Sequence, residues 1–336
     1  FSLFSFAMVT GATVLFVVGL GQGAAGALWG RWLAAVIVLV PTVVILRRNA
    51  RPVFQRAQLG AALAFSLPLV PHLISAWALN FSDRIILGKF ATLDDVGLYS
   101  VGYQFGLVVS VLITGINNAW TPWYFRVSTR GSGAPVPRFV TYYVMLVAAL
   151  GVGAALLARE AVRIMTAASY HDAWVIVPLV VLGYTINGLV ARFMDVLLLH
   201  KRTGVVPLTT IAAGVANIAF NLIAIPRLGI IGAAYGTIFG YSVRLALTAY
   251  YAARTAPLPF EWGRVARVIG LALLVAAPGL LADTGSVWLN VPLKLAIFAL
   301  FPLLLIGTGT LDGAERRALA DGWRQVRARL AAGIGR

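Results

Sequence analysis

Long apolar stretches separated by short polar connections fill almost the whole chain. A helix needs ~20 apolar residues to span a bilayer, and many of these stretches approach that length. We predict spanning helices at residues 2–20, 24–46, 59–80, 95–117, 138–158, 173–196, 205–224, 229–252, 265–282 and 289–309. The pattern therefore predicts an all-α fold: a polytopic membrane protein with about ten transmembrane helices.

Basic residues alternate from one connection to the next. They concentrate around residues 47–56, 126–138, 201–202 and 254–267 and in the C-terminal segment 311–336, whereas the intervening connections carry few. Because short loops rich in Lys and Arg stay in the cytoplasm, we expect these loops and the C-terminus to be cytoplasmic. The C-terminal segment also has the pattern of a basic amphipathic helix at the membrane surface.

The composition mainly excludes other classes of protein and site. The 336-residue chain is 60% hydrophobic and 11% charged, against about 25% charged in soluble domains. A formal charge of +16 would indicate nucleic acid in a soluble protein, but here arginines in short loops explain it through topology. The chain has no cysteine, and its three histidines show no metal spacing. Since phosphate-binding loops, nucleophile motifs and large loops are also missing, we expect no catalytic residue, no metal, no cofactor and no enzyme.

A glycine motif occurs twice, as G-A-A-G-A-L-W-G at residues 23–30 and G-I-I-G-A-A-Y-G at residues 229–236. Small residues let helices approach closely, so packing explains each motif taken singly. Their recurrence at the start of the second and eighth predicted helices favours two homologous bundles, as in many transporters.

The repeat predicts how the chain is organised. Because it begins with Phe1 inside an apolar run, we expect a fragment that lacks an even number of N-terminal helices, from an intact protein of about 14 helices. The chain would be a two-lobed transporter with an incomplete N-terminal lobe. Its parts are the last two helices of that lobe, a cytoplasmic inter-lobe linker, a complete six-helix C-terminal lobe, two additional transmembrane helices and the basic tail, at residues 1–46, 47–58, 59–253, 254–310 and 311–336.

Charged residues near membrane depth are the first candidates for function. Asp83, Arg84 and Lys89 lie between two long apolar blocks, where a charge costs roughly 2.5–3.5 kcal/mol even on the lenient insertion scale. Arg84 is the candidate anion contact because its planar fork suits phosphate. An ion pair with Asp83 is the alternative, and snorkelling to the interface is the alternative for Lys89.

Further candidates lie inside the spans. Arg244 is mid-helix and needs a partner or a wet cavity, whereas Arg192 has Asp195 three residues on and a local pair as its alternative. Pro68 and Pro71 form a candidate hinge, with a static kink as the alternative. The predicted substrate-binding set of cavity cations and polar residues is Arg84, Arg244, Arg192, Lys89, Asn80 and Arg31.

Three segments carry a family resemblance. They are Asp83-Arg-Ile-Ile-Leu-Gly-Lys-Phe with Asp95-Val-Gly-Leu-Tyr-Ser-Val-Gly-Tyr103, then Asn117-Asn-Ala-Trp-Thr-Pro122-Trp, and Ile225-Pro-Arg-Leu-Gly-Ile-Ile-Gly-Ala-Ala234. They resemble the polysaccharide-biosynthesis transporters, the Wzx-type lipid-linked oligosaccharide flippases of the multidrug/oligosaccharidyl-lipid/polysaccharide exporter superfamily. The resemblance implies two six-helix lobes within usually about 12 or 14 helices.

The resemblance also implies a function. Its cargo would be undecaprenyl-pyrophosphate-linked oligosaccharide repeat units, flipped by alternating access across the bacterial inner membrane for O-antigen lipopolysaccharide, capsule or exopolysaccharide. The implied partners are this lipid-linked substrate, membrane lipids and a polysaccharide polymerase, and no nucleic acid. Since some members couple to ion gradients, Asp83 and Asp195 become candidate coupling sites.

Two alternatives stay open. A cation-coupled drug exporter of the same superfamily would favour acidic and aromatic cavity residues over arginine. A polytopic membrane enzyme of polysaccharide assembly would need a larger periplasmic loop than this chain has.

Overall fold

The computed structural model describes residues 2–49, 55–67, 70–130 and 136–317. All regular structure in these ranges is helical, as predicted. Seven helices of the described part are long and apolar enough to cross a membrane, so the chain is a multi-pass membrane protein. Its contacts divide the chain into two compact units, residues 1–67 and 68–336. The predicted lobe boundaries stay a prediction.

The first unit is a helical hairpin followed by a short helix. It consists of α1 (Ser2–Val14), a π-helical turn η1 (Leu15–Gly19), α2 (Gly23–Asn49) and α3 (Arg56–Ser66). α1 and η1 pack along α2.

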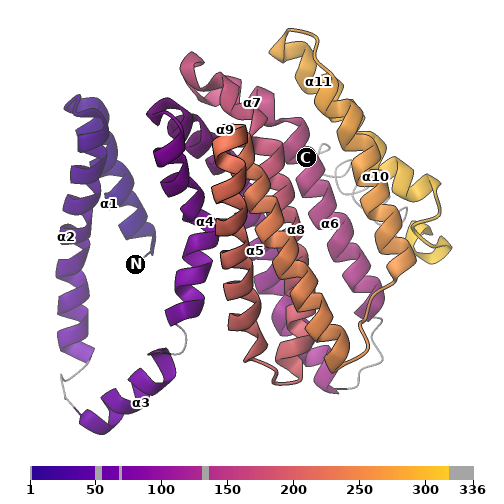
Figure 1. The fold of residues 1–336 in the computed structure, drawn as a ribbon, viewed down its shortest axis with the longest axis horizontal. Coiled ribbons are helices and arrows are strands. Elements are labelled where there is room, and N and C mark those ends of the chain that lie inside the picture. The colour runs from indigo at the N-terminus through magenta and orange to yellow at the C-terminus, as the bar shows by residue number, and fades with distance from the viewer. Residues whose placement is uncertain (1, 50–54, 68–69, 131–135, 318–336) are drawn as a thin grey trace, which may run out of the picture. The chain divides into compact units, whose positions relative to one another are not determined.

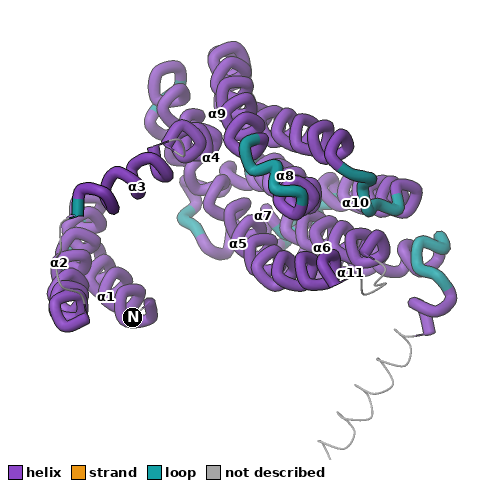
Figure 2. Tube along the Cα trace, turned by 90° about the horizontal axis from the view of Figure 1, so that it is seen from below, coloured by secondary structure: helices purple, strands orange, loops and turns teal. Residues whose placement is uncertain are grey.

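The second unit is a helical bundle (Figures 1 and 2). Its elements are α4 (Val70–Phe90), α5 (Leu93–Arg130), α6 (Val136–Leu156), α7 (Ala158–Met165), the 3-10 helix η3 (Ala168–Val175), α8 (Val177–Leu199), α9 (Val205–Thr255), α10 (Trp262–Leu281) and α11 (Val287–Gly307). α9 packs against both α4 and α8, and α5 packs against α8. α10 and α11 lie against α6, so these two helices join the flank of the bundle opposite α4.

α9 consists of two membrane-length helices. Its 51 residues are far longer than a bilayer requires, and Gly229 breaks it with a left-handed φ of 56° and a ψ of −133°. Glycine adopts this backbone conformation without steric cost. The break lies between the predicted spans 205–224 and 229–252, which are confirmed as separate segments.

The glycine motif plays the same structural part in both units. Gly23 and Gly229 open the motifs with nearly equal φ values of 54° and 56°. A β-carbon built at Gly30 would lie 2.7 Å from the Cα of Thr13, and one built at Gly232 would lie 2.6 Å from a carbonyl oxygen of the preceding helix half. The motif therefore allows backbone-to-backbone contact with the helix before it in each unit.

The third predicted span was wrong. Residues 59–80 do not form one helix, because α3 ends at Ser66 and α4 begins at Val70. Pro71 lies in the first turn of α4, where a missing N–H is tolerated and causes no kink; Pro68 lies outside the described residues. α4 then continues to Phe90, so the charged cluster expected between apolar blocks lies within the helix. The hinge itself stays a prediction.

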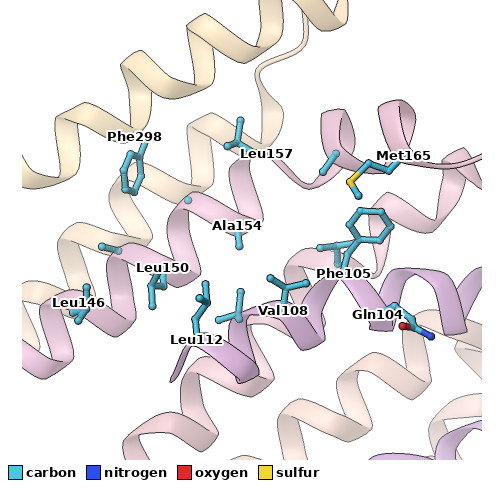
Figure 3. Close-up of a pocket in the computed structure, with 15 residues that line it drawn as sticks. Gln104, Phe105, Val108, Leu112, Leu146, Leu150, Ala154, Leu157, Met165 and Phe298 are labelled. Carbon is cyan, nitrogen blue, oxygen red and sulfur yellow. The ribbon is translucent and has the colours of Figure 1, made fainter. Parts of the chain in front are cut away.

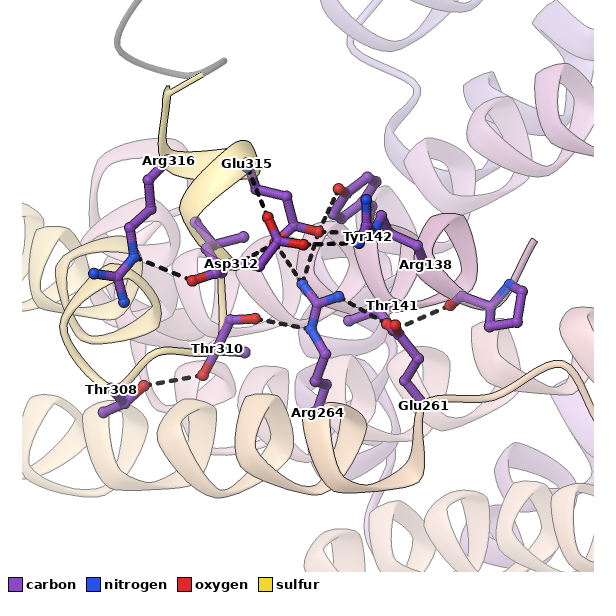
Figure 4. Close-up of polar contacts among 12 residues, drawn as sticks. Arg138, Thr141, Tyr142, Glu261, Arg264, Thr308, Thr310, Asp312, Glu315 and Arg316 are labelled. Atoms are coloured by element: carbon purple, nitrogen blue, oxygen red, sulfur yellow. Dashed lines mark hydrogen bonds and ion pairs between the residues drawn. The ribbon is translucent and has the colours of Figure 1, made fainter. Parts of the chain in front are cut away.

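One end of the second unit is held together by an ion network (Figure 4). Arg264 Nη2 donates to both carboxylate oxygens of Glu315, at 2.9 and 2.7 Å, and Arg138 Nη2 donates to Asp312 at 2.7 Å. Although burial opposes the shift, hydrogen bonds from Tyr142 and Arg264 lower the pKa of Glu315. Arg138, Arg264 and Glu315 belong to three segments that the charge pattern assigned to the cytoplasmic side of the membrane. These segments therefore lie at the same end of the second unit. The predicted tail beyond residue 317 lies outside the described residues.

The opposite end has a second network. Lys294 on α11 donates to both oxygens of Glu160 on α7 at 2.9 Å, and both side chains are buried. Asp283 lies in the loop before α11. Hydrogen bonds from the amide of Asn290 and a backbone N–H, together with the Arg159 guanidinium, hold the pKa of Asp283 at about 2, well below its ordinary value. These contacts tie α11 and the loop before it to α7.

The close approach at the motif makes a stability prediction. Gly232→Ala should destabilise the protein by about 1–3 kcal/mol, because the new methyl group would meet backbone atoms that cannot move away independently. Gly88→Ala is the matched control, since no atom lies within 4 Å of its β-carbon position. Thermal unfolding in detergent measures both; equal stability of the two variants would contradict the proposed packing.

Candidate functional site

A continuous group of polar side chains lies among the inner helices α4, α5, α8 and α9, and we call it the polar seam. It comprises His72, Asn80, Asp83, Arg84, Tyr99, Tyr103, Tyr184, Asn187, Tyr241 and Arg244. All four helices belong to the second unit, so the seam is built within one compact body.

Asn80 is the hub of the seam. Its Oδ1 accepts hydrogen bonds from the hydroxyls of Tyr103, Tyr184 and Tyr241 at 3.4, 3.4 and 3.1 Å. Its Nδ2 donates to the carbonyl of Ala76 one turn back, at 2.7 Å. One amide group therefore joins four helices, and the tyrosine rings pack against each other with centroids 5.7 and 5.8 Å apart.

Arg84 is held at three points. Its Nη1 donates to the carbonyl of Asn80 at 2.7 Å and lies 3.4 Å from Asp83 Oδ1. The guanidinium carbon lies 4.3 Å from the ring centroid of Tyr103, a cation–π contact. Arg84 is 22% exposed and Asp83 only 2%, and Tyr99 donates its hydroxyl to the carboxylate of Asp83. The ion pair with Asp83 thus exists, but it involves only the Nη1 atom of the guanidinium.

Arg244 is the less satisfied cation. Its Nη1 donates to Asn187 Oδ1 at 3.0 Å, and its Nε is buried without a hydrogen-bond partner among the described residues. No acidic side chain of the described part forms an ion pair with it. His72, which also carries a buried unpaired nitrogen, lies within electrostatic range. This end of the seam therefore has positive charge available for a ligand.

Arg192 lies outside the seam, in a closed cluster of its own. It is 2% exposed, forms an i,i+3 ion pair with Asp195 at 3.3 Å, and donates to Asn117 Oδ1 at 2.9 Å. Its guanidinium lies over the rings of Trp120 and Tyr143, at 4.4 and 4.2 Å from their centroids. The local pair exists, and the predicted binding role of Arg192 stays a prediction.

Two other predicted cavity cations do not join the seam. Lys89 is exposed in the last turn of α4, a position that suits a snorkelling side chain. Arg31 is exposed on α2 in the first unit. Their predicted binding roles stay predictions.

An apolar groove lies on the other side of α5 (Figure 3). It has a volume of about 860 Å³ and is lined by side chains of α5 to α8 and by Phe298 of α11. Val108 and Leu112 on its wall are 57% and 48% exposed, and Met165 of α7 at one end is 73% exposed. Gln104 is the polar side chain among the lining residues. Since Tyr103 next to it faces the seam, α5 forms one wall of both features.

Sequence reasoning identified the seam's charges but missed its tyrosines. Tyr99 and Tyr103 are one turn apart on α5, a spacing that puts them on one helix face. That spacing was the available signal. Tyr184 and Tyr241 lie on α8 and α9, and the sequence alone did not predict that these helices pack against α4 and α5.

A protein family and a curated relative each match part of this chain. The family described as polysaccharide biosynthesis protein matches residues 2–128. The resemblance to the polysaccharide-biosynthesis transporters is confirmed. Lsg locus putative protein 1 of Haemophilus influenzae is 38% identical over 64 residues, which cover 19% of this chain and 16% of that protein.

A solved structure shares the fold. The lipid II flippase MurJ in its inward closed conformation matches with a TM-score of 0.70 and 12% identity. The match covers 90% of this chain and 66% of that one, so the chain spans just under two thirds of the flippase. The chain therefore has a MurJ-like transporter fold.

The closed cluster gives a prediction that separates structure from function. Arg192→Met would leave Asp195 buried without its cation, so we expect a loss of about 3–5 kcal/mol in unfolding free energy. The double variant Arg192→Met with Asp195→Leu removes both charges and should recover most of that loss. Thermal unfolding in detergent measures this, and a double variant no more stable than the single one would contradict the pairing.

Proposed function

We propose that the chain forms most of a flippase that moves undecaprenyl-pyrophosphate-linked oligosaccharide repeat units across the bacterial inner membrane by alternating access. The observation that carries the proposal is Arg244, a cation at membrane depth with no acidic partner among the described residues. Such a charge persists where it serves a ligand or a wet cavity. The family match and the transporter fold support the same reading.

The polar seam would bind the pyrophosphate. Arg84 uses Nη1 for its protein contacts, which leaves Nε and Nη2 for another acceptor. Arginine binds phosphate oxygens through such paired donors. Arg244 lies one turn beyond Tyr241 on α9 and donates to Asn187, so it extends the seam beyond the Asn80 hub.

The groove beside α5 would take the first part of the lipid tail. Its walls are apolar and its side chains are already exposed to the surroundings. A lipid-linked cargo needs such a lateral opening, because its tail stays in hydrocarbon while its sugars cross in a polar cavity. No chemical step is required, and the protein acts as a transporter rather than an enzyme.

Orientation and partners follow from the same proposal. The arginine-rich end with the Arg264 network would face the cytoplasm, together with the C-terminus. A polysaccharide polymerase would receive the flipped cargo on the other side.

The cationic seam can be tested directly. Arg84→Ala and Arg244→Ala should each lower surface polysaccharide about tenfold or more, since each removes charge-assisted hydrogen bonds to the cargo. Lipid-linked repeat units should accumulate in the cytoplasmic leaflet. Arg267→Ala, an exposed arginine on α10, is the matched control. Normal polymer at normal protein levels in both variants would overturn the proposal.

The groove makes an independent prediction. Ala154→Phe would fill the groove and should slow export several-fold without loss of folding, because the side chain enters existing space. Ala277→Phe places the same ring on the exposed face of α10 and should leave export unchanged. Equal export rates for the two variants, in a vesicle assay with lipid-linked substrate, would remove the tail from the groove.

A further inference from the structure

Asp83 has one cation at hand. The titratable groups that face it are Arg84 from α4, Tyr99 and Tyr103 from α5, Tyr184 from α8 and Tyr241 from α9. Among the described residues, Arg84 alone supplies a positive charge within ion-pair distance. The carboxylate is 2% exposed, so water cannot substitute for that charge.

Arg84 and Asp83 differ in access. The guanidinium is 22% exposed and meets Asp83 through Nη1 at 3.4 Å, a long contact. Among the described residues, its Nε and Nη2 donate no hydrogen bond, so an anion can approach them while Asp83 stays enclosed. The arrangement allows two anions to flank one cation.

We propose that a cargo anion and Asp83 share Arg84, so that binding of the anion makes Asp83 take up a proton. The inference rests on the proposed function, because it needs an anion at Arg84. Without cargo, the carboxylate and the guanidinium balance each other. With a pyrophosphate diester bound, the two positive charges of Arg84 and Arg244 face three negative charges in a low-dielectric site, and protonation of Asp83 removes the excess negative charge.

The proton balance is simple. One proton from bulk water binds a carboxylate oxygen of Asp83, and no other bond forms or breaks. The Tyr99 hydroxyl can rotate and accept a hydrogen bond from the new acid, since a hydroxyl is both donor and acceptor. Asp83 thus serves as the counter-anion of Arg84 when no cargo is bound. Cargo binding neutralises the Asp83 carboxylate by protonation and does not move its side chain.

The other buried arginines lack this arrangement. Arg192 and Asp195 are both enclosed, at 1% and 5% side-chain exposure, so no external anion reaches that pair. Arg244 has access to a ligand but has no carboxylate to respond. Proton linkage is therefore expected at Arg84 alone among these three.

The test counts protons on binding. The probe is UDP-glucose, a disubstituted pyrophosphate whose own charge is constant between about pH 5.5 and 8. Calorimetric titration of the full protein in lipid nanodiscs, in two buffers of different ionisation enthalpy, should show uptake approaching one proton per probe. Affinity should then rise up to about tenfold per unit fall in pH.

Two variants separate the possible outcomes. Asp83→Asn should bind the probe without proton uptake and without pH dependence, whereas Asp94→Asn, which changes an exposed acid in the first turn of α5, should behave as wild type. Arg84-dependent binding with no proton uptake by the wild-type protein would overturn this inference and leave the proposed function standing. Binding that survives Arg84→Ala unchanged, or no binding at any pH, would overturn both.

Discussion

The structure depends on one constraint: a charge buried among membrane helices must find a partner. Lys294 and Glu160 neutralise each other completely, and each is nearly inaccessible. Arg192 is enclosed by an acid, an amide and two aromatic rings. These closed pairs fix helix packing and leave nothing for a ligand. Arg244 breaks the pattern because no acidic side chain of the described part pairs with it, and the proposed function rests on that exception.

Much of the fold could be predicted from the sequence because hydrophobic length and glycine spacing are local signals. The break at Gly229 follows from a motif that needs both a left-handed residue and close helix contact. The third predicted span, residues 59–80, was wrong because it was drawn from hydropathy alone. Hydropathy indicates which residues face lipid, whereas backbone hydrogen bonding determines where a helix begins and ends. α4 therefore continues through Asp83 and Arg84, whose charges are satisfied by each other and by Tyr99.

The site could be predicted only in part, for a related reason. Arg84 and Arg244 were identified because an isolated charge is costly whatever surrounds it. The tyrosines are amphipathic and carry no such cost, so their role emerges only when four helices bring their hydroxyls to Asn80. Arg192 shows the opposite limit: the sequence offered both a local pair and a cavity role, and only the tertiary structure shows the pair packed against Trp120 and Tyr143.

The shared wall formed by α5 determines what each feature can contribute to recognition. A lipid tail already lies in hydrocarbon before it meets the protein, so moving it into an apolar groove gains almost no hydrophobic free energy. The groove can orient the cargo but cannot select it by affinity. In the proposed function, selection would then come from the seam, where Arg84 and Arg244 would donate hydrogen bonds to the anionic headgroup. Because Tyr103 and Gln104 are neighbours on α5, a headgroup held at the seam places its tail within reach of the groove.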